Sequence, residues 1–102
     1  DGQTVRVFND RGACLATAYV TPDILPGVAR LATGAWFDPD TPGEPGGLER
    51  HGNPNVLTRD AGASGLSQGC SAQTCLVDVA PWHDPDPAVR AFEPPAFTTA
   101  LL

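Results

Sequence analysis

Glycine and proline are spread along the whole chain and leave little room for helices. The 102 residues include 11 glycines and 11 prolines, and few stretches longer than ten residues lack both. Proline removes a backbone hydrogen bond from a helix interior and glycine costs backbone entropy there, so both residues tend to end helices. Short β-branched runs between turn signals recur instead, which predicts a mainly β domain, either a barrel or a sandwich.

The composition indicates one folded, loop-rich domain. Hydrophobic residues make up 41% of the chain, which is near the value of ordinary globular domains and above that of disordered segments. A chain of 102 residues has the size of a single domain. The chain contains no methionine and opens at Asp1 directly before an alternating apolar run, so we expect it to be a piece of a longer protein.

The clearest local signal is a β-hairpin at the start. Val5 and Val7 alternate with polar residues, residues 9–12 (NDRG) supply turn chemistry, and an extended pattern resumes over residues 14–20. A pair of antiparallel strands is therefore predicted.

Further along the chain the signals are weaker. Thr21 can cap one helical turn, after which residues 28–33 are predicted to form a third strand. Residues 34–55 form a long Gly/Pro-rich loop of a length that is usually functional or mobile. The last strand is predicted at residues 74–79, and the Pro-rich remainder is expected to lie extended over a surface.

Charge and cysteine content exclude several classes of protein. The net charge is −6 with six basic residues in all, which argues against nucleic acid as a partner. The apolar runs are too short for a membrane span, and no signal peptide is visible. Cys14, Cys70 and Cys75 form no CxxC pair, which indicates neither a zinc site nor a disulfide framework. We expect a cytoplasmic protein, with the periplasm as the alternative if a signal lies upstream.

Two neighbouring segments concentrate amides, hydroxyls and glycines. These are residues 51–58 (HGNPNVLT) and residues 63–69 (ASGLSQG). Amide side chains present a donor beside an acceptor, as the edge of a pterin or guanine requires, and glycines let backbone N–H groups approach a phosphate. A phosphorylated heterocycle would fit them. The alternative is that the first segment is turn chemistry only.

Other candidate sites are weaker. His51 and His83 lack partners at ligand spacing, and the serines lie in no nucleophile motif, so no metal ligand or catalytic residue is assigned. Trp36 either closes a strand as a core aromatic or lines a ligand cleft. The acidic residues of the long loop lack the calcium-loop pattern and are expected to be solvated; they are Asp38, Asp40, Glu44 and Glu49.

Several segments together resemble one family. Residues 5–12 (VRVFNDRG), 33–39 (TGAWFDP) and 51–58, followed by Ser64 and Gln68, are similar in order and spacing to the terminal domain of the dimethyl sulfoxide reductase family. That family includes the trimethylamine N-oxide and biotin sulfoxide reductases. The chain differs from the family at Ala63 and Gly65, which replace a threonine and a basic residue, so no contact is assigned to those two side chains.

The resemblance implies a six-stranded double-psi β-barrel with short helical turns and long loops. It implies a barrel at residues 1–80 and an extended tail of the same domain at residues 81–102, which we expect to dock on other domains of the parent chain. It also implies binding of part of a bis(molybdopterin guanine dinucleotide) molybdenum cofactor. The implied contact residues are Arg11, Gly12, Trp36, Asn53, Asn55, Ser64 and Gln68.

The implied activity belongs to a larger molybdenum oxidoreductase that reduces S-oxides or N-oxides by oxygen-atom transfer. The preceding domains of the parent chain are the implied partners, and the domain alone would not be catalytic because its residues provide no redox centre. The alternative function is a stand-alone double-psi barrel that serves as a binding or interaction module without a redox role.

Overall fold

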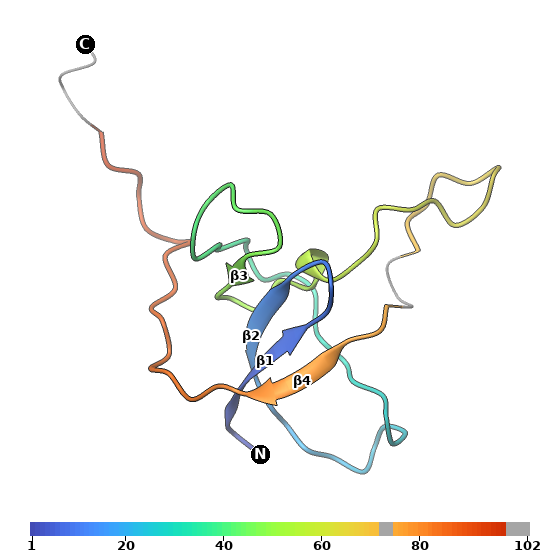
Figure 1. Cartoon of the computed structure of the whole chain (residues 1–102), viewed down its shortest axis with the longest axis horizontal. Coiled ribbons are helices and arrows are strands. Elements are labelled where there is room, and N and C mark those ends of the chain that lie inside the picture. Colours follow the sequence, from blue (N-terminus) through green and yellow to red (C-terminus); the bar gives the residue numbers. More distant parts are fainter. Residues whose placement is uncertain (72–74, 98–102) are drawn as a thin grey trace.

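The computed structural model describes residues 1–71 and 75–97, and its regular structure is mainly β (Figure 1). In these two stretches, four strands form one mixed sheet in the order β3-β2-β1-β4. The 3-10 helical turn η1 lies between β3 and β4 in the sequence. The bounds are β1 Thr4–Phe8, β2 Ala13–Thr17, β3 Leu48–Glu49, η1 Pro54–Val56 and β4 Asp78–Pro81.

The predicted hairpin is confirmed. β1 and β2 pair antiparallel over five residues each, with Val7 opposite Cys14. In the turn, the side-chain Oδ1 of Asn9 accepts a hydrogen bond from the N–H of Arg11 at 2.9 Å, and the N–H of Asn9 donates to the carbonyl of Gly12 at 3.0 Å. An asparagine side chain that binds backbone two residues ahead is common in turns, which explains why this signal could be read locally.

The third and last strands differ from the prediction. Residues 28–33 form no strand, and Val28 is mostly exposed; its N–H closes a turn on the carbonyl of Leu25 instead. Apolar alternation alone does not hold a strand that has no paired neighbour. The final strand, β4, begins at Asp78 rather than at residue 74, which lies outside the described residues.

The predicted helical turn at Thr21 is also wrong, although the capping contact exists. Thr21 Oγ1 accepts a hydrogen bond from the N–H of Asp23 at 3.2 Å, but the segment is a turn and not a helix. The turn η1 ends at Val56, and its C-cap residue Leu57 is buried.

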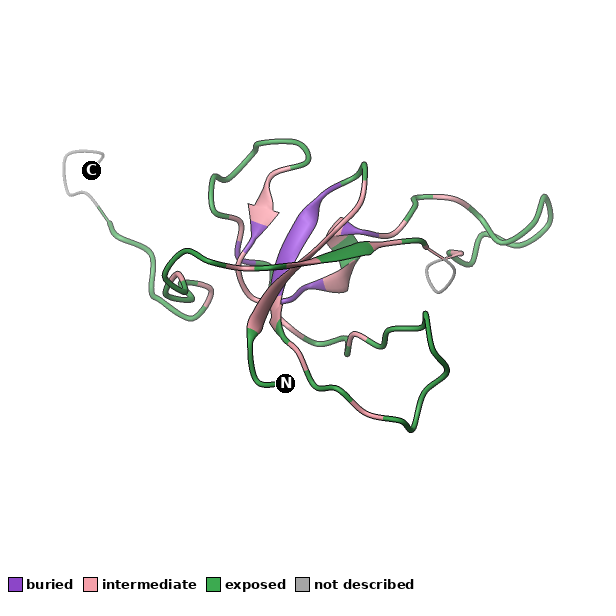
Figure 2. Ribbon diagram, turned by 60° about the horizontal axis from the view of Figure 1, so that its bottom comes forward, coloured by how far each residue is buried: buried purple, intermediate pink, exposed green. Residues whose placement is uncertain are grey.

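Very little of the described chain is fully buried (Figure 2). The buried apolar residues are Ala13, Cys14, Leu15 and Leu57, which lie on β2 and beside η1. The radius of gyration is 16.2 Å, compared with about 13 Å for a compact domain of this length. Within the described residues the sheet is open, with β3 and β4 at its edges. The chain therefore leaves much apolar surface for something else to cover.

After β4 the chain runs back across the sheet. Thr4 donates a hydrogen bond to Asp86 at 2.9 Å, and Phe92 packs beside Trp36 with ring centroids 5.2 Å apart. This part of the predicted tail is tied to its own domain rather than only to others. Residues 98–102 lie outside the described residues, so docking of the end of the tail stays a prediction.

In the part of the chain that the structure describes, no helix is long and apolar enough to span a membrane.

Candidate functional site

The buried carboxylate of Glu49 organises the loop that follows β3. Only 1% of Glu49 is exposed. Its Oε1 accepts hydrogen bonds from the backbone N–H groups of Asp38 at 3.1 Å and His51 at 2.9 Å, and its Oε2 accepts one from Asn53 at 2.7 Å. Three N–H groups around one carboxylate compensate its burial much as a loop cradles an anion. Glu49 thus joins the Asp38 segment to residues 51–53.

Asn53 continues this network into η1. Its Oδ1 accepts a hydrogen bond from the N–H of Asn55 at 2.9 Å, which caps the helical turn, and its Nδ2 donates to the carbonyl of Ala35 at 2.9 Å. Pro54 stands at the first helical position, where its missing N–H costs nothing. Asn53 is buried and uses both of its polar side-chain atoms within the chain.

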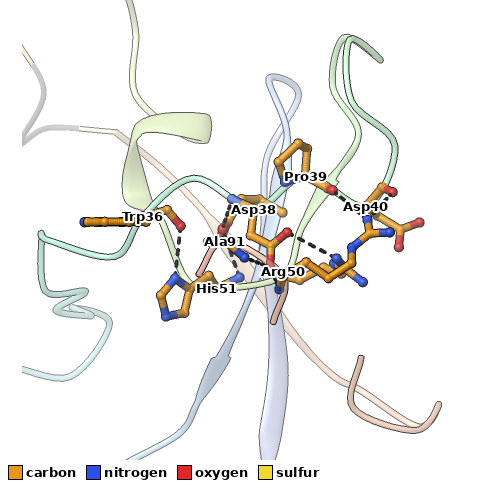
Figure 3. Close-up of polar contacts among 9 residues, drawn as sticks. Trp36, Asp38, Pro39, Asp40, Arg50, His51 and Ala91 are labelled. Atoms are coloured by element: carbon orange, nitrogen blue, oxygen red, sulfur yellow. Dashed lines mark hydrogen bonds and ion pairs between the residues drawn. The ribbon is translucent and has the colours of Figure 1, made fainter. Parts of the chain in front are cut away.

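A second buried carboxylate, Asp38, lies beside Arg50 (Figure 3). Arg50 Nη2 and Asp38 Oδ1 are 3.1 Å apart, and both side chains are almost fully buried. Burial by itself raises the pKa of Asp38, but the backbone N–H groups of Arg90 and Ala91 and the charge of Arg50 outweigh it and hold the pKa below its ordinary value. Asp38 is therefore ionised at neutral pH.

Trp36 and His51 stand next to this pair. His51 Nδ1 is 3.0 Å from the carbonyl oxygen of Trp36. Since a carbonyl oxygen can only accept, Nδ1 is the donor in this contact. The imidazole packs edge-on against Phe92, with an interplanar angle of 87°. Trp36 remains 63% exposed, so its indole is held at one side and open at the other.

Arg11 and Gly12, at the end of the hairpin turn, line a pocket of about 170 Å³ together with Val56 and part of the loop at residues 37–49. A Cβ at Gly12 would lie 2.8 Å from the carbonyl oxygen of Val56, so no larger residue fits there without a shift. The Arg11 guanidinium is partly exposed and 3.6 Å from Asp10. The pocket thus combines a close approach of backbone with an accessible cation.

Asn55 lies on the exposed side of η1. Its side chain makes no hydrogen bond within the described residues, and its backbone N–H is held by Asn53. A free amide on a fixed backbone is a good hydrogen-bonding group for a ligand. Because Gly12 contacts Val56, the structure brings Arg11, Gly12 and Asn55 into one region.

Ser64 and Gln68 are elsewhere. They lie in residues 59–71, which extend away from the sheet in both ribbon views (Figures 1 and 2). Ser64 Oγ accepts hydrogen bonds from Leu66 N at 3.3 Å and Ser67 N at 3.0 Å, while Gln68 is exposed. A bridge between Gly62 and Cys70 closes this excursion on itself. The structure does not bring these two residues to the Arg11 and Asn55 region.

The burial of these charged side chains was not predicted from the sequence. Asp38 and Glu49 were expected to be solvated, and both are buried; the expectation was wrong because backbone N–H groups distant in the sequence supply their partners. Arg50 was not singled out at all. An acidic residue in a Gly/Pro loop carries no local signal that distinguishes it from a solvated one.

Comparison with known proteins places the chain in a family. Residues 1–76 match the model of the family described as Molydopterin dinucleotide binding domain (molybdopterin in the usual spelling). The chain belongs to this family of molybdopterin dinucleotide-binding domains, as the resemblance predicted.

The relatives are bacterial oxidoreductases. The chain is 58% identical over 103 residues, and over all of its length, to biotin sulfoxide reductase from Cereibacter sphaeroides. It is 57% identical over 79 residues, or 78% of the chain, to trimethylamine-N-oxide reductase 1 from Escherichia coli K12. It is 42% identical over 95 residues, or 93% of the chain, to the dimethyl sulfoxide/trimethylamine N-oxide reductase of Cereibacter sphaeroides. These matches cover 13%, 9% and 12% of the relatives' own lengths.

Proposed function

We propose that the chain is the cofactor-binding domain of a larger molybdenum oxidoreductase that reduces S-oxides or N-oxides. Membership in the molybdopterin dinucleotide-binding family carries this proposal, and the names of the relatives supply the substrate class. The cofactor would be bis(molybdopterin guanine dinucleotide) molybdenum. When bound, it supplies two-electron redox chemistry at the metal.

The described residues fit such a ligand. The Arg11 guanidinium is the accessible cation near the pocket beside Gly12, and a phosphate needs such a charge together with backbone that can approach closely. Asn55 offers a free amide on a fixed backbone for a heterocycle edge. We assign direct contacts to Arg11, Gly12 and Asn55, and we assign Trp36 to the wall of the cleft.

The remaining predicted contacts need different roles. Both polar side-chain atoms of Asn53 are bonded to Asn55 and Ala35. In this proposal Asn53 therefore supports the site by capping η1 and so fixing Asn55. Ser64 and Gln68 would reach the cofactor from the excursion at residues 59–71.

The exposed apolar surface supports a place inside a larger protein. Large hydrophobic side chains that would be buried in a compact domain are exposed here, and burying each fully is worth roughly 1.5 to 3 kcal/mol. We propose that the preceding domains of the parent protein cover these side chains. We also propose that, in the full-length protein, residues 1–80 form a six-stranded double-psi barrel and residues 81–102 form its tail. The same exposure argues against the stand-alone binding module.

All three cysteines are free thiols, which suits a reducing compartment, and on that basis we propose the cytoplasm.

The test uses the full-length enzyme. We expect the purified protein to contain molybdenum and guanine nucleotide and to reduce biotin sulfoxide, trimethylamine N-oxide or dimethyl sulfoxide with a reduced viologen as electron donor. The 102-residue chain alone should show no reduction. An enzyme without molybdenum and nucleotide, or activity from the isolated chain, would overturn the proposal.

A further inference from the structure

We propose that Asp38 is a positioning residue: it fastens residues 86–92, here called the strap, across the loop that carries Trp36, and so holds the indole toward the substrate cleft. This inference rests on the proposed function. The strap lies beyond residue 76, where the match to the family model ends. It adds to the cofactor domain a part that the family model does not cover, although biotin sulfoxide reductase from Cereibacter sphaeroides matches the whole chain.

Among the described residues, the side-chain carboxylate of Asp38 accepts its hydrogen bonds from N–H groups alone. Its Oδ2 accepts from the backbone N–H groups of Arg90 and Ala91, and its Oδ1 accepts from Arg50. Only an ionised carboxylate offers two acceptor oxygens at once. An asparagine would keep one oxygen and place an NH₂ group against the other set of donors. Asp38 therefore joins the strap to the Arg50 segment, and close substitutes cannot do the same.

The strap is tied at more than this point. The Arg90 guanidinium donates to the carbonyl of Asp40 at 3.1 Å and to that of Pro39 at 3.4 Å, so it binds the same loop that carries Trp36 and Asp38. Near its start, Asp86 accepts a hydrogen bond from Thr4 on β1. Residues far apart in the sequence are thus linked over one short stretch of tail.

The strap ends in an aromatic contact with Trp36. The Phe92 ring lies 5.2 Å from the Trp36 indole and 5.3 Å from the His51 imidazole, centroid to centroid. Phe92 is itself exposed, so burial in a core does not account for its position. Its neighbours Arg90 and Ala91 are held by Asp38, which makes the orientation of Trp36 depend on that carboxylate. A small displacement of a group that lines a substrate cleft is enough to weaken substrate binding.

The experiment uses the full-length enzyme and steady-state reduction of biotin sulfoxide. The variant is Asp38→Asn, and the matched control is Glu93→Gln, which removes a negative charge from an exposed side chain one residue after the strap. We expect Asp38→Asn to raise KM about tenfold while kcat, per molybdenum bound, stays within about twofold of the wild type. Glu93→Gln should leave both constants unchanged.

A second pair of variants covers the case in which Asp38→Asn does not fold. Phe92→Leu should raise KM in the same direction, and Phe92→Tyr, which keeps the ring, should restore it. A KM in Asp38→Asn and in Phe92→Leu equal to that of Glu93→Gln would overturn the inference, and so would loss of molybdenum with KM unchanged. Failure of the wild-type enzyme to reduce any of the oxides would overturn the proposed function instead.

Discussion

The two segments predicted to bind the cofactor are built in different ways. The first, residues 51–58, is held by the buried carboxylate of Glu49 and by Asn53, whose partners come from residues as far back as Ala35. The second, residues 63–69, is held by Ser64 and by backbone hydrogen bonds of residues 61–71, from Ala63 N to Gly69 O and from Ser71 N to Ala61 O. Among the described residues, the first segment is fixed by tertiary bonds and the second by local ones.

This difference separates two kinds of binding group. A group on a fixed backbone is ready for its ligand, whereas a group on a locally held excursion must be ordered when the ligand binds, which costs conformational entropy. Of the contact residues that we propose, Asn55 belongs to the first kind and Gln68 to the second. We therefore expect the domain to bind its cofactor with one segment that is already ordered and one segment that becomes ordered on binding.

The largest expected effect comes from removing the Glu49 carboxylate, which fixes the first segment. Glu49→Ala leaves three backbone N–H groups without an acceptor in a buried place, so we expect the free energy of unfolding of the 102-residue chain to fall by about 3 to 5 kcal/mol. Ser64→Ala, in the exposed segment, should cost only about 0.5 kcal/mol. Urea unfolding of the two variants measures both, and equal losses would contradict the comparison.

Each segment also has a thiol that reports on it. Cys14 pairs with Glu49 across β2 and β3, and burial, followed by the charge of Glu49, raises its pKa from 9.0 to about 11. Cys70 closes the excursion and is exposed. At pH 8 that change in pKa alone reduces the thiolate fraction of Cys14 about a hundredfold.

We therefore expect iodoacetamide to label Cys70 at least about a hundred times faster than Cys14, as followed by peptide mass spectrometry. Denatured chain, in which the two rates should converge, is the control. Because the folded chain holds the Cys14 proton more tightly than the unfolded chain, stability should also fall as the pH rises from 9 to 11. Equal native labelling rates would show that the first segment is not closed.

How much of the fold could be predicted from the sequence depends on how far apart in the sequence the contacting residues lie. The hairpin could be predicted because its alternation and its Asn9 turn lie within a few neighbouring residues. β3 could not, because it has two residues and pairs in parallel with Ala13, far back in the chain. The buried roles of Asp38 and Glu49 were missed for the same reason.

For the candidate site, too, the roles that depend on distant residues could not be predicted from the sequence. Gly12 was predicted from the motif, and the structure gives a steric reason for it in the Val56 carbonyl. The sequence of residues 51–58 gives no reason to treat Asn53 and Asn55 differently. In the structure the Asn53 side chain bonds to Ala35 and Asn55, whereas the Asn55 side chain makes no hydrogen bond with the described residues. The different roles of the two asparagines depend on contacts with Ala35 and Glu49, which no local sequence pattern predicts.

The different roles of Asn53 and Asn55 give the next prediction. In the full-length enzyme, Asn55→Ala should lower the molybdenum content more than Asn53→Ala, because a lost hydrogen bond to a buried cofactor atom costs roughly 1 to 3 kcal/mol. Asn53→Ala should instead lower the melting temperature of the domain, because it uncaps η1 and frees the Ala35 carbonyl. Molybdenum is measured by plasma mass spectrometry on folded protein. Equal content in both variants would reject the ranking.

The smallest expected effect concerns acid. The pKa of Asp38 is lowered in the folded chain, so its contribution to stability is complete above the ordinary value of 3.8 and is lost as the pH falls through the folded value. Residues 61–69 contain no ionisable side chain, so the second segment has no such dependence of its own. Between pH 5 and pH 2, the backbone amides of Arg90 and Ala91, which donate to Asp38, should lose protection against hydrogen exchange, beyond the intrinsic pH effect, while those of residues 61–69 should not. Asp38→Asn should remove the difference, since the variant cannot titrate there, and the exposed Asp23→Asn should keep it. Acid loss of protection that is the same in the two sets of amides, or that persists in Asp38→Asn, would mean that the buried carboxylate does not distinguish them.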